Sequence, residues 1–235
     1  MFLILSCALL SLPAFPCAGQ AGQADIDEIS AKFLARIDEA EKKGDWERIF
    51  GLYEDALRRH RSRVAPDPDH PGIMVGVGEY LVRRYSRLPA AAFDHYRITR
   101  DTRARQALKM AAAEKDPFEL DRALSLYFFA SMSDEYLDRM ALRLQERGLF
   151  DEALLYWDRL LRYHPDDDIP REILLARMAI ACRLAGNGAR LAELKTYREE
   201  RKIDGTIRAG RETLTLSRFL DSVEIPPAGK SVARP

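Results

Sequence analysis

The clearest helical pattern in the sequence is GLFDEALLYWDRLLRYHP, residues 148–165. Gly148 permits a tight turn out of a preceding helix, and Pro165 stops the helix that follows. Between them, apolar side chains recur at steps of three and four residues, which is the spacing of one helix face. The residues on that face are Phe150, Ala153, Leu154, Trp157, Leu160 and Leu161.

An earlier stretch, GDWERIFGLYEDAL at residues 44–57, aligns with this one position by position. The pattern resembles the second half of a tetratricopeptide repeat, whose unit is about 34 residues long. In such a pair the glycine forms the turn, the small residue lets two helices approach, and the aromatic residue fills the space against the next helix. The residues that define the repeat here are Gly44, Trp46, Tyr53, Ala56, Gly148, Phe150, Ala153, Trp157 and Pro165.

Helix-breaking residues divide the rest of the chain into further pairs. The best copy covers Asp134–Asp167 and a weaker one covers Ser30–Val64. Degenerate pairs cover Thr102–Ser131 and Ile169–Arg201. We therefore predict an all-α fold in which antiparallel helix pairs stack as a tetratricopeptide-like α-solenoid over residues 25–204. An irregular helical bundle with similar hairpins is the alternative.

No strand is expected before the final tail. The glycine-bearing stretch at residues 72–78 lacks the spacing of a phosphate-binding loop, so it is interpreted as the start of a helix that runs to about Arg84. Residues 205–235 are assigned to a C-terminal linker or tail, within which Thr213–Ser222 forms a last short helix or strand.

The N-terminal stretch, residues 1–24, carries no charged residue and is almost continuously apolar from Phe2 to Leu12. Prolines and small residues follow, which is typical of a secretory signal peptide, although no basic residue precedes the apolar run. The apolar run is also shorter than the ~20 residues that span a bilayer. We expect an exported protein, periplasmic or extracellular, and we favour simple export over lipid anchoring. Removal of the signal would leave Cys182 as a single, buried and inert thiol.

Composition excludes several classes of protein. The chain has 235 residues, of which 47% are hydrophobic, with a mean hydropathy of −0.31, so it is neither wholly disordered nor a polytopic membrane protein. Lys and Arg number 37 against 37 Asp and Glu, and this zero net charge argues against a dedicated nucleic-acid binder.

One stretch nevertheless departs from neutrality. Residues 83–105 contain seven arginines and only two acidic residues, Asp94 and Asp101, so the stretch has a surplus of five positive charges. Such a patch could meet an acidic partner, an anionic membrane surface or a polyanion, whereas the simpler interpretation is an ordinary helical surface. The arginines are Arg83, Arg84, Arg87, Arg97, Arg100, Arg103 and Arg105.

No catalytic, cofactor-binding or metal-binding residue is assigned. The chain lacks the G-x-S-x-G, H-E-x-x-H and C-x-x-C motifs. Imidazole lies beside carboxylates in residues 67–71 and 164–168, where zinc or a hard cation could bind, but proline and aspartate at those places favour solvated turns between helices. The aromatic cluster at residues 127–129 is interpreted as core between stacked pairs.

A wider resemblance rests on four tracts: LPAAAFDHYR at 88–97, RGLFDEALLYW at 147–157, RLAG at 183–186 and RAGRETLTL at 208–216. Together they resemble the helical module that precedes a pyrroloquinoline-quinone-type β-propeller in large secreted bacterial proteins. The last tract is similar to the segment that joins the helices to the propeller. Because this sequence has no series of Trp- and Gly-bearing blade repeats, the quinone or ligand of a propeller is not carried over.

These observations predict an exported, non-catalytic helical-repeat protein that binds another protein. The alternative is an accessory helical module of a quinoprotein-type enzyme or assembly whose propeller is encoded separately.

Overall fold

A computed structural model describes residues 33, 35–61, 63–67, 70, 73–114, 116–166 and 168–225. Within these residues the chain is mostly helical, which confirms the all-α class, with two short β-hairpins added. The N-terminal stretch that is expected to be a signal peptide lies outside the described residues, as do residues 226–235.

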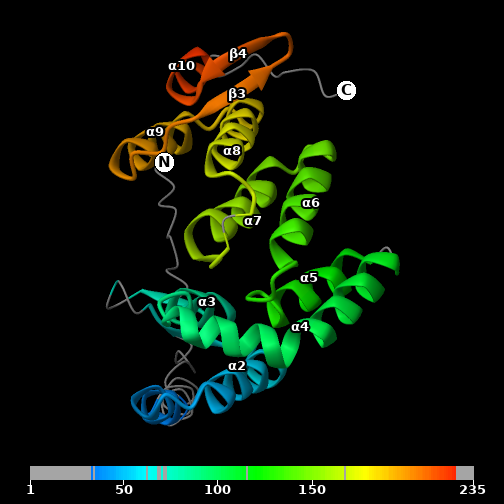
Figure 1. Cartoon of the computed structure of the whole chain (residues 1–235). Helices are drawn as coiled ribbons and strands as arrows, with labels where there is room; N and C mark the ends of the chain where they lie inside the picture. The colour runs from blue at the N-terminus through cyan, green and yellow to red at the C-terminus, as the bar shows by residue number, and fades with distance from the viewer. Residues whose placement is uncertain are drawn as a thin grey trace, which may run out of the picture.

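The helices form two groups that follow each other along the chain (Figure 1). The first group begins with a helical segment over residues 35–43 and continues with α2 (Trp46–His60), α3 (Val77–Tyr85), α4 (Ala90–Ala113) and α5 (Pro117–Leu126). The second group consists of α6 (Ser133–Glu146), α7 (Phe150–Tyr163), α8 (Arg171–Ala185), α9 (Gly188–Glu200) and α10 (Leu216–Ser222). In Figure 1, α6 and α7 lie between the first group and the end formed by α8, α9 and α10.

The predicted turns between paired helices are present. Gly148 joins α6 to α7 with a φ of +77°, and the Leu149 N–H donates to the Leu144 carbonyl at 2.9 Å. This hydrogen bond is typical of a helix C-terminus at which the next residue has a left-handed backbone conformation. Glycine adopts that conformation without strain. Gly44 precedes α2 in the same way, with a φ of +63° and a 3.0 Å bond from the Asp45 N–H to the Ala40 carbonyl.

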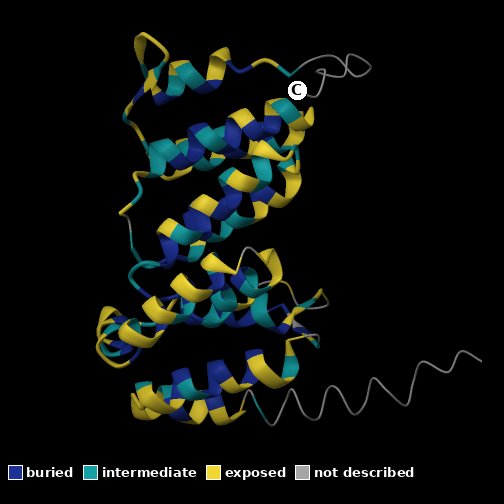
Figure 2. Cartoon of the chain, turned by 90° about the vertical axis from the view of Figure 1, so that its right-hand side faces the viewer, coloured by how far each residue is buried: buried dark blue, intermediate teal, exposed yellow. Residues whose placement is uncertain are grey.

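The aromatic positions of the repeat pattern are the centres of packing. Tyr53 and Trp157 are fully buried, whereas Trp46 and Phe150 are partly buried. The cluster at residues 127–129 is buried as expected, and Phe129 lies 5.6 Å from the Tyr53 ring and 6.2 Å from the Tyr96 ring, centroid to centroid. Figure 2 shows the buried residues on the helix sides that face neighbouring helices.

The expectation of no strand before the tail is wrong. Strands β1 (Val64–Pro66) and β2 (Met74–Gly76) pair antiparallel, with Ala65 opposite Val75. Their connecting loop is closed by a 2.7 Å bond from the Asp67 N–H to the Ile73 carbonyl. The helix that was expected to start near residue 72 therefore begins at Val77, because residues 74–76 are held extended by the pairing with β1.

The C-terminal segment assigned to a linker or tail contains folded structure. Strands β3 (Thr206–Ala209) and β4 (Glu212–Thr215) form a hairpin, and α10 follows β4 directly. Leu216 and Leu220 of α10 are fully buried, and the helix packs on α8. The prediction of a short helix or strand over residues 213–222 is confirmed in both forms, since the strand ends at Thr215 and the helix occupies the rest.

In the described part of the chain, each helix is too short or too polar to cross a bilayer.

Candidate functional site

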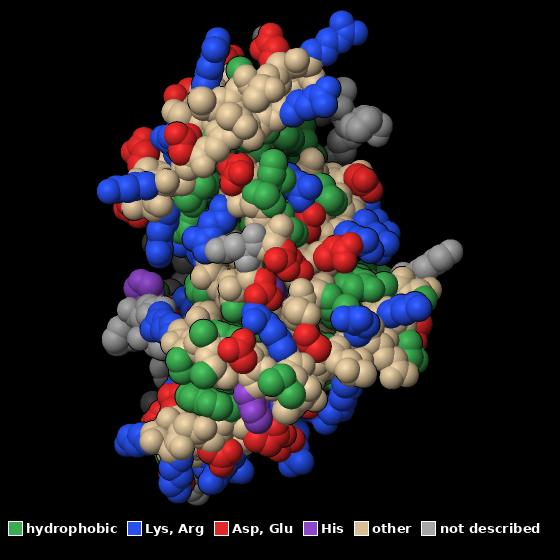
Figure 3. Space-filling view, viewed as in Figure 1, with side chains coloured by type: hydrophobic (Ala, Val, Ile, Leu, Met, Phe, Trp, Pro, Cys, Tyr) green, Lys and Arg blue, Asp and Glu red, His purple; other side chains and the backbone are tan. Residues whose placement is uncertain are grey.

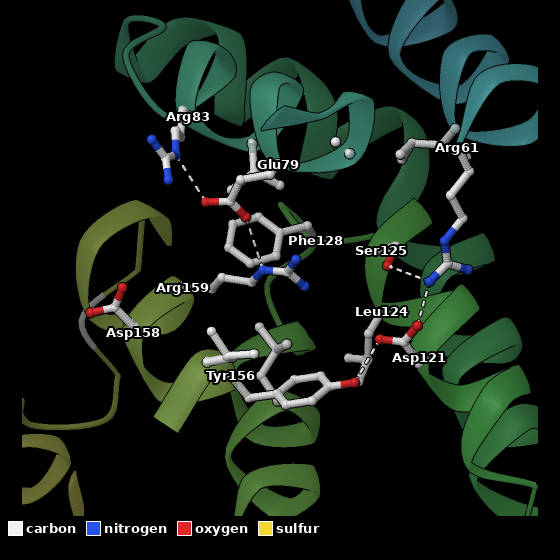
Figure 4. A pocket seen from close by; sticks show the side chains of 16 residues that line it. Arg61, Glu79, Arg83, Asp121, Leu124, Ser125, Phe128, Tyr156, Asp158 and Arg159 are labelled. Carbon is white, nitrogen blue, oxygen red and sulfur yellow. Dashed lines mark hydrogen bonds and ion pairs between the residues drawn. The ribbon is translucent and has the colours of Figure 1, made fainter. Parts of the chain in front are cut away.

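A cavity of about 520 Å³ lies between the two groups of helices. That volume falls in the usual range for ligand pockets. Its walls come from the end of α2, the β2–α3 junction, α5, α6 and α7, so segments far apart in the sequence meet here. Figure 4 shows the labelled charged and aromatic side chains converging on this space from several helices.

Part of the cavity wall is apolar. Its residues share deep burial and come from four helices and the α5–α6 connection: Leu57, Val82, Leu124, Phe128 and Leu137. Gly76 and Gly78, from the glycine-bearing stretch that the sequence singles out, also line it. A Cβ atom at Gly76 would meet nothing within 4 Å, so the absence of a side chain there adds open space to the cavity wall.

A carboxylate in the cavity wall bridges two helices. Glu79 of α3 accepts a hydrogen bond from the Arg83 Nε at 2.9 Å and one from the Arg159 Nε of α7 at 3.1 Å. Because Arg159 belongs to the second group of helices, this bridge links the two groups across the cavity wall. Arg83 also donates to Asp67 at 2.8 Å.

A second carboxylate links α5, α7 and the end of α2. Asp121 accepts a 2.6 Å hydrogen bond from the Tyr156 hydroxyl and an ion pair from Arg61. Arg61 further donates to the Ser125 hydroxyl at 3.4 Å. Burial and the hydrogen bond to Asp121 raise the pKa of Tyr156 above its usual value, so this phenol stays protonated and keeps donating at neutral pH.

Sequence reasoning missed most of the charged residues of this cavity, although Arg83 belongs to the arginine-rich stretch that it singled out. Arg61, Asp121 and Arg159 are ordinary charged residues in the sequence, and only the fold brings them together. One signal was available: Leu155 lies off the core face of α7, where it is 65% exposed, and Arg159 follows it one helical turn later.

The arginine-rich stretch does not form a free basic surface. Its members lie on α3, on α4 and between them, and carboxylates from elsewhere in the chain meet most of them; Figure 3 shows basic and acidic side chains interspersed on the visible face. Arg83 pairs with Asp67 and Glu79, Arg84 with Asp38 and Glu41, Arg97 with Asp94 and Asp166, Arg100 with Glu47 and Glu54, and Arg103 with Glu54. Arg105 is exposed on α4.

Arg100 is the most enclosed of these arginines, at 7% exposure. It donates to both carboxylate oxygens of Glu47 at 2.9 Å and to Glu54 at 3.0 Å. Its guanidinium lies 5.8 Å from the ring centroids of Phe50 and Tyr96. The hydrogen bonds from Arg100 lower the pKa of Glu47 to about 2. These contacts give Arg100 a structural role inside the first group of helices.

The structure brings a serine and a histidine together in an arrangement that does not fit nucleophilic catalysis. His164, expected in a solvated turn, is instead buried, because it packs on Phe128 with ring centroids 5.5 Å apart. Its Nδ1 accepts the Asp166 backbone N–H at 3.2 Å, so the ring proton sits on Nε2 and is donated to the Ser133 hydroxyl at 2.9 Å. Ser133 then donates to the Phe128 carbonyl at 2.5 Å. A general base would need a free Nε2 lone pair facing that hydroxyl, and here Nε2 is the donor.

Acidification is expected to destabilise the protein through His164. Burial lowers the pKa of His164 below its usual value, against the opposing effects of Asp134 and Asp166. The unfolded chain therefore takes up the proton first, and the stability from neutral His164 is complete above about pH 6.5 and lost as the pH falls through the lower folded pKa. Urea unfolding between pH 7.5 and 5.5 measures this loss.

In a His164→Gln variant the free energy of unfolding should change less over the same pH range. His70→Gln serves as the control, because the His70 side chain is 65% exposed, and it should follow the parent protein. An equal pH dependence in the parent and in His164→Gln would contradict the assignment.

Metal ligands and reactive thiols do not gather in the described residues. No group of three or more His, Cys, Asp or Glu side chains in that part of the chain could hold a metal ion. Cys182 is buried in α8, as expected, and burial raises its pKa to about 11, which keeps the thiol protonated and unreactive.

The fold and the cavity together define a mostly helical protein with a ligand-sized space between its two groups of helices. The chain matches no family model, no curated protein and no solved structure.

Proposed function

We propose that this chain is an exported, non-catalytic helical-repeat protein that binds a segment of another protein in the central cavity. The observation that carries the proposal is the cavity itself, whose volume of about 520 Å³ is lined both by apolar side chains and by paired charges. Peptide segments bind to helical arrays through such mixed surfaces. Export rests on the uncharged, apolar N-terminal stretch.

The stacked, tetratricopeptide-like arrangement is part of this proposal, and contacts among successive helices support it. Asp138 of α6 accepts a 2.8 Å hydrogen bond from the Trp157 indole of α7 and an ion pair from Arg177 of α8. Helix α7 packs on both α6 and α8, and α8 packs in turn on α9. A side chain that joins three consecutive helices is what a stacked array of helix pairs requires.

Affinity capture with the full chain as bait tests the function. Ser125→Phe should obstruct part of the cavity, because Ser125 lines it and its hydroxyl points toward Arg61 (Figure 4). Arg122→Phe is the matched control, since it adds the same side chain to the same helix at a position where the arginine is 68% exposed. Against an extract of the native organism, quantified by mass spectrometry, we expect proteins that are retained by the parent and the control and lost with Ser125→Phe.

Retention of the same proteins by all three baits would overturn the proposal. Capture of a protein with β-propeller blades would support the alternative function, in which this chain is the accessory helical module of a separately encoded propeller. Circular dichroism of the three baits separates lost binding from lost folding, because an unfolded Ser125→Phe chain would show reduced helicity.

A further inference from the structure

The guanidinium of Arg159 has unused donors that face the cavity. Its Nε donates to Glu79, and neither of its terminal nitrogens has a hydrogen-bond or ion-pair partner among the described residues. Figure 4 shows these two nitrogens pointing away from Glu79 into the space between Phe128 and Tyr156. The side chain is 38% exposed, so the donors are accessible but partly shielded from bulk water.

Two of the three carboxylates around the cavity, Glu79 and Asp121, already accept through both oxygens. Glu79 receives two arginines, and Asp121 receives Arg61 and the Tyr156 hydroxyl. Asp158 accepts from Arg162 at 2.7 Å and from Arg190, both through Oδ1. A group that enters the cavity therefore finds free donors on Arg159, whereas Glu79 and Asp121 are occupied by their own partners.

We propose that the cavity binds the side-chain carboxylate of a glutamate, or of the shorter aspartate, on the partner protein. The two terminal nitrogens of Arg159 form a planar fork that matches the two oxygens of a carboxylate. The methylene stem of the acidic side chain packs on Phe128 and Leu124, which line the apolar part of the cavity wall. This inference rests on the proposed protein-binding function and names the chemistry that the cavity recognises.

A side chain fits this site better than a chain terminus does. A C-terminal carboxylate brings its own backbone N–H groups into the cavity, and these need acceptors. Since both oxygens of Glu79 and of Asp121 are engaged by arginines and a tyrosine, N–H groups beside these two carboxylates would be left without them as partners, at a cost. An acidic side chain adds only apolar methylenes and the carboxylate.

Selection from synthetic peptides tests the proposal. The first probe is a pool of random hexapeptides that are acetylated at the N-terminus and amidated at the C-terminus, so that every carboxylate belongs to Asp or Glu. The second probe is a pool without Asp and Glu that carries free C-terminal carboxylates. On the immobilised full chain, we expect enrichment of Glu-containing and Asp-containing peptides from the first pool and no comparable enrichment from the second.

Variants then locate the contact. Arg159→Gln should lower the affinity for the enriched peptides about tenfold or more, which is the loss expected for a charged, bidentate hydrogen bond. Arg159→Lys should lower this affinity less. Arg122→Gln, on the exposed face of α5, should bind like the parent protein. Fluorescence anisotropy with the labelled peptides measures these affinities.

The outcomes separate the two proposals. Peptides without Asp and Glu that bind the parent protein but not Ser125→Phe would overturn the carboxylate inference. They would leave the proposal of peptide binding in the cavity intact. Acidic peptides that bind Arg159→Gln as tightly as the parent would also overturn the inference. Binders that survive Ser125→Phe would place the interaction outside the cavity and overturn both proposals. A lack of binders from the first pool would overturn the inference.

Discussion

Replacement of Trp157 with alanine is expected to lower the free energy of unfolding by about 3–5 kcal/mol. The indole is fully buried in α7, so its removal leaves a cavity in the interface with the neighbouring helices. The change also removes the 2.8 Å hydrogen bond from the indole to Asp138, a carboxylate that is itself only 8% exposed. Single domains are stable by about 5–15 kcal/mol in total, so this one change should remove a large part of the stability of the protein.

Urea unfolding followed by circular dichroism measures the effect. Trp157→Phe separates the contribution of packing from that of the hydrogen bond, because phenylalanine keeps most of the apolar volume and lacks the indole donor. We expect this variant to lower the free energy of unfolding by about 1–3 kcal/mol. Trp46→Ala is the matched control, since this second tryptophan is only partly buried and should cost clearly less. A loss below about 1 kcal/mol for Trp157→Ala would show that the α6–α7 pair does not depend on the aromatic residue of the repeat pattern.

The helix pairs could be predicted because their determinants are local. The spacing of Phe150, Ala153 and Trp157 specifies one buried face, and Gly148 marks the turn at which the chain reverses. These signals operate within one or two helical turns and need no knowledge of the rest of the fold. Strand β2 escaped prediction because the strand with which it pairs, β1, lies across a loop and is three residues long.

The cavity and the arginine-rich stretch could not be interpreted from the sequence for the opposite reason. The contacts from Arg61 to Asp121 and from Arg159 to Glu79 span large distances along the chain. A count of charges between residues 83 and 105 likewise omits Glu47 and Glu54, which the fold places against Arg100. Local charge counting cannot detect such partners, so a surplus in one stretch does not predict a basic surface.

Replacement of Arg100 with methionine is expected to lower the free energy of unfolding by about 3 kcal/mol. The side chain of Glu54 is 11% exposed, and loss of its 3.0 Å contact with Arg100 leaves a carboxylate in a poorly hydrated place. Methionine retains some apolar packing against Phe50 and Tyr96 but not the attraction of a cation to their rings. Arg58, which also reaches Glu54 at 3.0 Å, limits the cost.

Arg103→Met is the matched control for urea unfolding, because Arg103 lies on the same helix, is 61% exposed and meets Glu54 only at 3.7 Å; its cost should stay within about 0.5 kcal/mol. Arg100→Met combined with Glu54→Gln should be less destabilised than the sum of the two single variants, by about 1–3 kcal/mol, since the second change removes the stranded charge. Additive costs would mean that Arg100 acts through packing alone. If Arg100→Met kept full stability and lost the captured partner, Arg100 would be a binding residue, as the charge pattern of the sequence first suggested.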